Sequence, residues 1–198
     1  MSLETLSIDH LPPNYRVHAA LFRDVSNPDF LHAQLLARNN AYDFAFIDAA
    51  SVISRLHLLS AIFRALTTLA DGTLTATTPH AEIVLSFGVN NNVSDAYRRY
   101  GISPKTKDVI VVKVVVTEEG KEDQAQSAED IWAHLAENVK GTQTELTDEE
   151  IAKLTDWQKV RKYYGLNNVP GIQKGWSEER RNKELETLVI MKMALRGL

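Results

Sequence analysis

Hydrophobic and polar residues follow two different periods along this chain, and these periods predict its strands and helices. The run from Val109 to Val116 holds a single polar residue, Lys113, and therefore predicts a strand that is covered on both faces. Apolar residues alternate with polar ones from Tyr15 to Phe22 and from Ala81 to Phe87, which predicts two half-buried strands. A further strand is expected from Asp43 to Ala49.

Apolar residues at three- and four-residue spacing predict a long helix between these strands. Ser51 is expected to cap its first turn, and Asp71-Gly72 ends it. Two apolar rows together cover about half of its circumference, more than the ~100° stripe that a surface helix needs. Two interpretations stay open: the helix is deeply buried in its own fold, which periodicity alone favours, or it binds a partner. The rows are Val52, Leu56, Leu59, Phe63 and Leu66, and Leu58, Ile62, Ala65 and Leu69.

The last predicted helix changes character halfway along. Ser177 is expected to cap it, and its first half, from Glu178 to Glu186, is charged. The second half, from Leu188 to Leu195, is apolar almost all the way round, but it is far too short to cross a bilayer. Because a terminal segment is rarely enclosed on every side by its own domain, this pattern favours a partner surface over a place in the core.

Residues with capping side chains mark the beginnings of five shorter helices. Asn27 stands before Pro28, whose fixed φ suits the first turn of a helix. Asn92 begins a helix that Gly101 ends, and Gly101 is expected in the left-handed conformation. The other three helices are expected to begin at Ser127, Thr147 and Asp156.

The order of these elements predicts a single domain over residues 1–198 with an α+β fold. We expect a mixed sheet of about four strands with helices packed on it. A strand–helix–strand unit, formed by residues 81–87, 93–100 and 109–116, is expected at its centre. The hydrophobic content of 44% is sufficient for a sizeable core.

The composition and the absence of known motifs exclude several classes of catalytic and metal-binding site. The chain contains no cysteine, which excludes disulfides, thiol catalysis and cysteine-ligated metal sites. The histidines are scattered, and no phosphate loop, GxGxxG or GxSxG motif is present. His57 is interpreted as part of the narrow polar edge of the long helix, with a catalytic role as the lesser alternative. We therefore expect no catalytic site, metal or cofactor, and neither a signal peptide nor a membrane span.

Net charge gives no reason to expect a general attraction to nucleic acid. At −4 the chain is mildly acidic, so any contact with RNA requires a local basic patch. Basic and aromatic side chains together can bind single-stranded nucleic acid, although solvated helix faces have the same composition. The candidate clusters are Arg98 and Arg99 with Lys105 and Lys107, and Lys159, Arg161 and Lys162 with Tyr163 and Tyr164.

The middle of the chain resembles a known family. It combines an apolar segment before Asn90-Asn91-Asn92, the sequence SDAYRRYGI from Ser94 to Ile102, and the apolar run that ends at Val116. This ordered combination resembles the signature of the PRPK-binding (TPRKB) family, the small regulatory subunit of the KEOPS/EKC complex.

The resemblance implies a function without catalysis. Members of this family bind the small N-lobe of the kinase-like ATPase subunit of the complex and stimulate it. The assembly installs threonylcarbamoyl on the adenosine beside the tRNA anticodon, archaeal relatives capture the tRNA acceptor end, and fungal members are linked to telomere maintenance. The resemblance thus implies a kinase-like partner, contact with tRNA, a location in the nucleus and cytoplasm, and no membrane.

The family's kinase contacts match the long helix and the last helix of this chain. The residues that the resemblance implies are Leu58, Ile62, Ala65, Leu69, Leu188, Met191, Ala194 and Leu195. Arg98 and Arg99, with Lys105, are the candidates for a modest tRNA contact. The alternative is a stand-alone module that binds RNA or a small ligand. Co-purification with a small kinase-like protein would distinguish the two.

Overall fold

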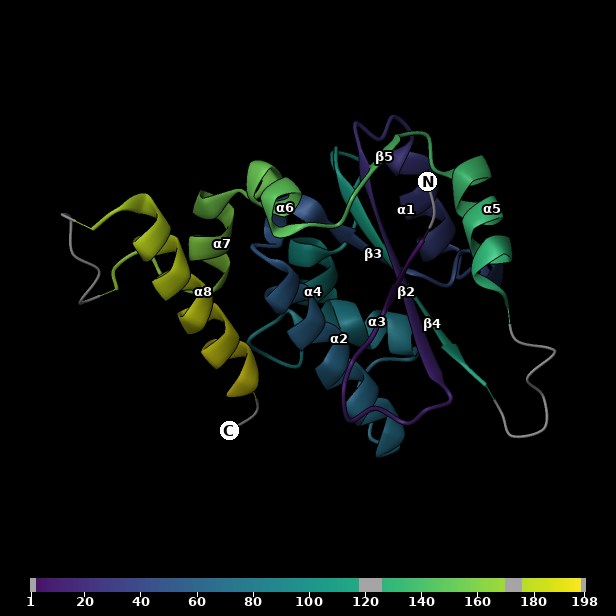
Figure 1. The fold of residues 1–198 in the computed structure, drawn as a ribbon, viewed down its shortest axis with the longest axis horizontal. Coiled ribbons are helices and arrows are strands. Elements are labelled where there is room, and N and C mark those ends of the chain that lie inside the picture. The colour runs from purple at the N-terminus through teal and green to yellow at the C-terminus, as the bar shows by residue number, and fades with distance from the viewer. Residues whose placement is uncertain (1–2, 118–125, 170–175, 197–198) are drawn as a thin grey trace.

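The computed structural model of the chain describes residues 3–117, 126–169 and 176–196, and it places an open sheet between two layers of helices (Figure 1). The strand order is β1-β2-β4-β3, and β5 also pairs with β2. All pairings between these strands are antiparallel, so the α+β class is confirmed while the sheet is antiparallel rather than mixed. The strands are β1 (Glu4–Leu6), β2 (Tyr15–Arg23), β3 (Ala45–Asp48), β4 (Val109–Val116) and β5 (Thr142–Thr144).

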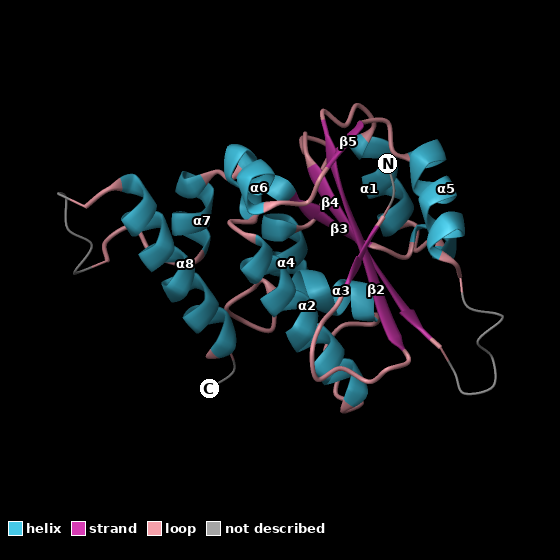
Figure 2. Ribbon diagram, in the orientation of Figure 1, coloured by secondary structure: helices cyan, strands magenta, loops and turns pink. Residues whose placement is uncertain are grey.

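Helices cover both faces of the sheet and give the chain two hydrophobic cores (Figure 2). Successive side chains of β2 enter the two cores in turn, because neighbouring residues of a strand point to opposite faces. The larger core is formed with α2 (Arg55–Ala70), α3 (Pro79–Ser86), α4 (Val93–Tyr100), α6 (Asp148–Leu154), α7 (Trp157–Tyr163) and α8 (Glu178–Ala194). The smaller core is formed with α1 (Pro28–Leu36) and α5 (Ala128–Asn138).

The strand predicted from the long apolar run is β4, and it lies in the middle of the sheet as expected. It pairs with β2 on one side, from Tyr15 opposite Val116 to Phe22 opposite Val109, and with β3 on the other. The predicted strands at residues 15–22 and 43–49 are therefore confirmed as β2 and β3. The sequence did not predict β1 and β5, because a strand of three residues is too short to show a period.

The strand predicted at residues 81–87 is wrong, because this stretch belongs to the helix α3. Thr78 caps the helix by accepting a hydrogen bond from the Ala81 N–H (3.2 Å), and a proline occupies its first turn. Residues 80–87 are all buried, so the polar side chain of Glu82 faces the interior and marks no solvent face. The central unit is consequently helix, helix and strand rather than strand, helix and strand.

The beginning of α2 also differs from its prediction. Ser54 caps the helix, and its hydroxyl accepts a hydrogen bond from the His57 N–H (3.1 Å). Ser51, the predicted cap, lies in a 3₁₀ turn before the helix and donates to the Asp48 carbonyl (2.7 Å). The end of the helix is as predicted, since Gly72 has a φ of +66°, which is the left-handed conformation.

Gly101 ends α4 at the predicted position but not in the predicted conformation. Its φ is −76°, so the expectation of a left-handed residue is wrong. Glycine is required for a different reason: a Cβ here would lie 2.8 Å from the Tyr97 carbonyl oxygen. This close approach allows the chain to bridge to Ile47 on the edge strand β3.

The remaining helix starts are confirmed, with one change of role. The residues that cap their helices through the side chain are Asn92, Ser127, Thr147, Asp156 and Ser177. Pro28 begins α1, but the Asn27 side chain makes no cap bond. Its amide donates to the Asn138 carbonyl (2.8 Å), and its oxygen accepts from the Lys140 N–H (2.9 Å). Asn27 thereby joins the start of α1 to the end of α5.

Candidate partner-binding surface

The α2 residues that were expected to bind a partner face the interior. Leu58, Ile62 and Ala65 are fully buried in the larger core, and Leu69 is half-buried against it. In this structure these side chains have little or no surface to offer a partner. The burial of this row agrees with the interpretation that the helix is buried within the chain's own fold.

The exposed apolar surface of α2 comes from its other row. Leu56 and Phe63 keep 52% and 40% of their surface exposed, and Leu59 between them is half-buried. These positions are three and four residues apart and therefore share one face of the helix. They were not among the residues implied by the family resemblance, although the spacing of their row was visible in the sequence.

α8 buries one face and exposes the other. Its buried apolar residues lie four positions apart in the larger core: Leu185, Val189 and Met193. Met191 and Leu195 are 52% and 56% exposed, Ala194 is exposed, and Leu188 is half-buried. The residues predicted on this helix thus lie on its outer and lateral sides.

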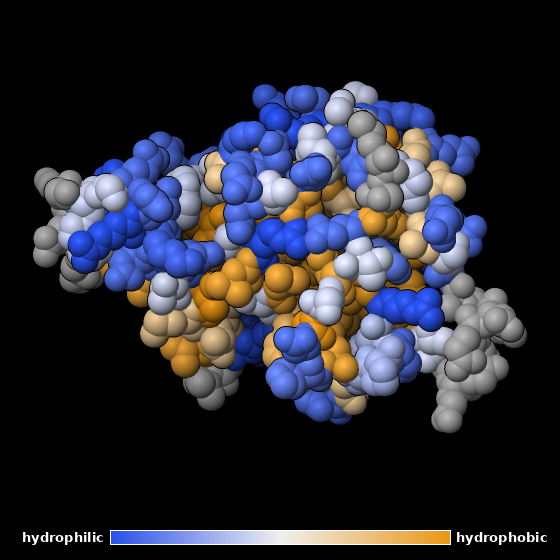
Figure 3. Space-filling view, in the orientation of Figure 1, coloured by the Kyte–Doolittle hydropathy of each residue, from blue (hydrophilic) through white to orange (hydrophobic). Residues whose placement is uncertain are grey.

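We call the exposed apolar residues of these two helices the docking face. It consists of Leu56, Leu59 and Phe63 on α2 and Leu188, Met191, Ala194 and Leu195 on α8. The two helices are in contact, and Figure 3 shows hydrophobic side chains in the regions of both. Large exposed apolar patches are uncommon on monomeric soluble proteins, so this face is the candidate binding surface for another protein.

Three charged side chains hold the end of α8 to α2 and α3. Arg196 and Glu82 form an ion pair inside the molecule, with 3.5 Å between Nη2 and Oε1. Arg196 also donates to the carbonyl of Leu85, and Arg64 donates to the carbonyls of Met193 and Arg196. We call Arg64, Glu82 and Arg196 the clasp. The clasp was not predicted from the sequence, although a charged residue within an apolar run, as at Glu82, is a signal for such a pair.

His57 lies inside the molecule, so its predicted place on a polar helix edge is wrong. Its Nδ1 accepts a hydrogen bond from the Ile53 N–H (3.3 Å), which assigns the proton to Nε2, and Nε2 donates to the Tyr164 hydroxyl (2.9 Å). That hydroxyl donates in turn to the Phe87 carbonyl (2.6 Å). Burial lowers the pKa of His57 to about 3, because the interior disfavours the charged imidazolium. His57 is therefore a neutral structural group.

The structure brings together parts of the two basic clusters. The Arg99 guanidinium lies 5.6 Å from the centroid of the Tyr163 ring and donates to the Tyr163 carbonyl (3.1 Å). Asp95 forms ion pairs with both Arg98 and Arg99. The Arg98 side chain is 75% exposed and that of Arg99 28%, and Lys105 is exposed. Arg98 therefore has the more accessible charge of the two arginines.

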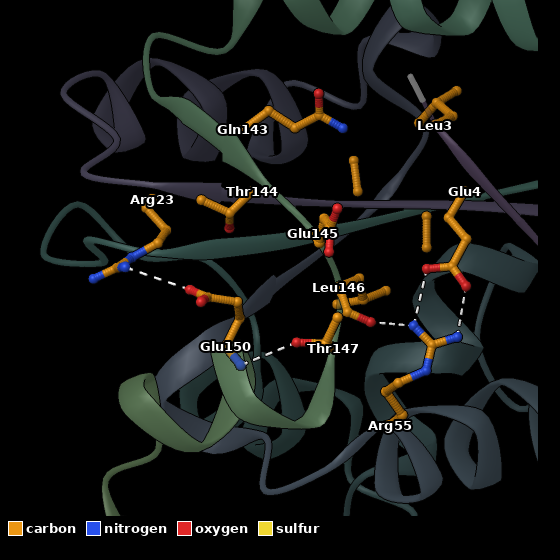
Figure 4. Close-up of a pocket in the computed structure, with 12 residues that line it drawn as sticks. Leu3, Glu4, Arg23, Arg55, Gln143, Thr144, Glu145, Leu146, Thr147 and Glu150 are labelled. Carbon is orange, nitrogen blue, oxygen red and sulfur yellow. Dashed lines mark hydrogen bonds and ion pairs between the residues drawn. The ribbon is translucent and has the colours of Figure 1, made fainter. Parts of the chain in front are cut away.

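A cleft of about 1000 Å³ opens beside β1 and β5 (Figure 4). Arg55 binds both carboxylate oxygens of Glu4, with 2.9 Å between Nη1 and Oε2, and Arg23 lies 3.5 Å from Glu150. These pairs tie β1 to α2 and β2 to α6, which gives the charged groups a structural role. In the part of the chain that the structure describes, no three potential metal ligands come together. Nor does any described helix combine the length and apolar content needed to cross a membrane.

Comparison with known proteins gives matches over the whole chain. The sequence model of the family described as "Kinase binding protein CGI-121" matches residues 22–197. The EKC/KEOPS complex subunit cgi121 of Neurospora crassa is 52% identical over 207 aligned residues, which cover 100% of both chains. The subunit CGI121 of Gibberella zeae is 50% identical over 199, again with 100% of both chains covered. The cgi121 subunit of Schizosaccharomyces pombe is 34% identical over 155, covering 78% of this chain and 84% of its own.

Proposed function

Because the chain belongs to the CGI-121 family of kinase-binding proteins, we propose that it is a non-catalytic EKC/KEOPS subunit that binds and stimulates the kinase-like ATPase subunit of the complex. The family's description supports the kinase partner, and the names of the fungal relatives support the complex. Through the assembled complex it serves threonylcarbamoyladenosine modification of tRNA and telomere maintenance. Its proposed location is the nucleus and the cytoplasm, including chromosome ends.

The docking face is the observation that carries this proposal. Burial of a large apolar side chain on association contributes about 1.5–3 kcal/mol, and Phe63, Met191 and Leu195 offer three such side chains. Both helices are anchored in a shared core, so the face is preorganised and less entropy is lost on binding. A folded partner with an apolar surface, such as the small lobe of a kinase-like protein, fits a face of this kind.

Reconstitution from purified components tests the proposal. The chain is mixed with the kinase-like subunit of the same organism, and the complex is followed by size-exclusion chromatography while ATP hydrolysis is measured with and without the chain. We expect a stable complex and faster hydrolysis. Leu195→Asp should weaken the complex, whereas the matched control Leu36→Asp should not, because Leu36 is 73% exposed on α1, which packs on the other core.

The alternative function gives the opposite result in the same experiment. A stand-alone module that binds RNA or a small ligand would bind tRNA or that ligand and show no affinity for the kinase-like subunit. If the wild-type chain leaves the column separately from the kinase-like subunit and does not change its ATPase rate, the proposed function is wrong.

A second contact, with the acceptor end of tRNA, is proposed for Arg98, Arg99 and Lys105. The stacking of Arg99 on Tyr163 favours it, because a cation beside an aromatic ring can hold both a phosphate and a base. Asp95 offsets part of the positive charge, so this contact should be weak and sensitive to salt.

A further inference from the structure

The C-terminal half of α8 has apolar residues on almost every side, so hydrophobic burial alone does not determine which side faces the core. Hydrophobic attraction has no direction, and a rotation of the helix about its axis would bury Met191 and Leu195 in place of Val189 and Met193. The structure nevertheless shows one arrangement, with Val189 and Met193 inside. In this half of the helix, a feature other than the apolar pattern is needed to select the rotation.

Glu82 defines a fixed place for a cation in the interior. One of its carboxylate oxygens, Oε2, accepts hydrogen bonds from the backbone N–H groups of Thr75 (3.0 Å) and Ala76 (2.7 Å). The other, Oε1, faces the Arg196 guanidinium, and both side chains are buried. A buried carboxylate that loses its cation is strongly unfavourable. The position of Arg196 is therefore set by α3 and the loop before it.

Arg64 holds the same end of α8 from α2. The last carbonyls of a helix have no partner within the helix, and they carry the negative end of its dipole. Arg64 donates to one of them, that of Met193, and also to the carbonyl of Arg196 just beyond the helix, with 2.9 Å between Nη2 and the Arg196 oxygen. The end of α8 is thus held from two sides. Arg64 of α2 binds its backbone, and Glu82 of α3 binds the side chain of Arg196.

The clasp and the docking face lie on different sides of the same turn. Successive helix positions are about 100° apart, which places Met193 and Arg196 on a common inner side. Met191 and Leu195 then point away from that side, as their exposure shows. Contact between Arg196 and Glu82 is consequently incompatible with a rotation that buries Met191 and Leu195.

We propose that the clasp selects the rotation of α8 and thereby keeps Met191 and Leu195 in the docking face. Arg64, Glu82 and Arg196 are positioning residues, since they act through α8. Compared with apolar replacements, buried ion pairs add little net stability, but they can specify one arrangement among several. The inference rests on the proposed function only for the use of the docking face, because the rotation of α8 is a property of the isolated chain.

Thiol labelling measures this rotation directly, because the chain contains no cysteine of its own. Val189→Cys and Met191→Cys are each made in the wild-type background and in the double variant Glu82→Leu/Arg196→Met, which replaces the ion pair by apolar side chains. Labelling rates are measured under native conditions. In the wild-type background the Met191→Cys variant should react much faster. In the double variant the ratio of the two rates should fall roughly tenfold or more, as the other rotation becomes populated.

Affinity for the kinase-like subunit is measured for the wild-type chain and for the double variant, both without the added cysteines. If only about a half to a tenth of the molecules keep the rotation that can bind the partner, the apparent Kd rises about 2- to 10-fold. Arg196→Lys keeps the charge and should retain most of the wild-type ratio and affinity. Arg64→Met, which removes only the contacts to the helix carbonyls, is a second variant for the same measurements in case the double variant does not fold.

Each outcome decides the inference. An unchanged labelling ratio overturns it, and so does a parallel rise at both positions, which would report general unfolding. A fall in the ratio with unchanged kinase affinity would show that the rotation does not serve docking. Failure of the wild-type chain to bind the kinase-like subunit would contradict the proposed function instead, while the labelling ratio would still decide what the clasp does.

Discussion

α2 and α8 both carry more apolar surface than a helix on the outside of a domain requires, but the fold uses the excess differently. α2 is covered by α3 and α8, so residues such as Ile62 are buried and a narrower stripe with Phe63 stays exposed. α8 lies at the margin and leaves Met191 and Leu195 outside. An excess of apolar residues therefore indicates a partner only on a helix that its own fold does not surround.

The largest expected effect concerns the ion pair between Glu82 of α3 and Arg196 at the end of α8. Arg196→Ala leaves Glu82 as an uncompensated buried charge and should lower the free energy of unfolding by about 3–5 kcal/mol. Urea denaturation measures this, with Arg98→Ala as the control, since the exposed Arg98–Asp95 pair contributes at most ~1 kcal/mol. Equal, small losses in both variants would mean that α8 is not held by its buried end.

The second prediction compares substitutions of an interior residue of α2 and an exterior residue of α8. Ile62→Ala removes a fully buried side chain and should lower the free energy of unfolding by about 2–5 kcal/mol. Met191→Ala should change it by no more than ~0.5 kcal/mol, because Met191 is exposed. The same denaturation series measures both. A large loss of unfolding free energy in Met191→Ala would mean that the outer side of α8 belongs to the core, and the contrast between α2 and α8 would be wrong.

The third effect uses pH to test the interior of α2. Unfolded His57 takes up a proton near its ordinary pKa of 6.5, but the folded form does so only near 3. The contribution of His57 to stability is therefore complete above pH 6.5 and falls by roughly 2 kcal/mol by pH 5. Denaturation at several pH values measures the slope, and His57→Gln should reduce it. Burial also lowers the pKa values of His18 and His80, so part of the slope should remain.

The fourth effect asks whether both helices contribute to one surface. Phe63→Glu and Met191→Glu should each weaken binding of the kinase-like subunit by at least ~10-fold, because each places a charge where an apolar side chain would be buried. Calorimetric titration gives the affinities, and denaturation confirms that both variants are folded. If Phe63→Glu binds like the wild type, the partner contacts α8 alone.

The smallest effect concerns tRNA. Arg98→Ala should weaken tRNA binding more than Arg99→Ala does, because Arg98 is exposed while Arg99 is partly covered by Tyr163. Each neutralised phosphate changes the slope of log K against log salt by about 0.7 on a single strand. A salt series on both variants measures this. Curves that coincide with the wild type would leave both arginines as charges at the end of α4.

The local sequence predicted those elements whose structure depends on their own residues and not on a partner that lies far away in the sequence. β4 was predicted because a strand buried on both faces needs only apolar residues, and α5 because Ser127 stands before apolar residues at helical spacing. α3 was not, since its alternation suggests a strand until the partner of Glu82 is known. That partner, Arg196, lies more than a hundred positions away in the sequence, and no local period reveals it.

The candidate site was predicted only in part for the same reason. Periodicity showed two apolar rows on α2, but contacts with α3 and α8 decide which row is buried. Ser51 was predicted to cap α2, but its hydroxyl donates to the Asp48 carbonyl, and Ser54 caps the helix instead. The outer residues of α8 were identified correctly as apolar, but their exposure depends on the rotation of the helix.

The pairing of β2 has a consequence for the synthesis of the chain. Its residues 15–22 pair with β4, which follows roughly 90–100 residues later, while its other edge pairs with β1, made before it, and with β5, made later still. At about 5–20 residues per second, β2 waits on the order of 5–20 s for its main partner during translation. Until then only the three-residue strand β1 is available to pair with it, and an apolar, β-forming segment with one edge unpaired for that time is a site of aggregation. Cells that make this protein should therefore need a chaperone for it at the ribosome.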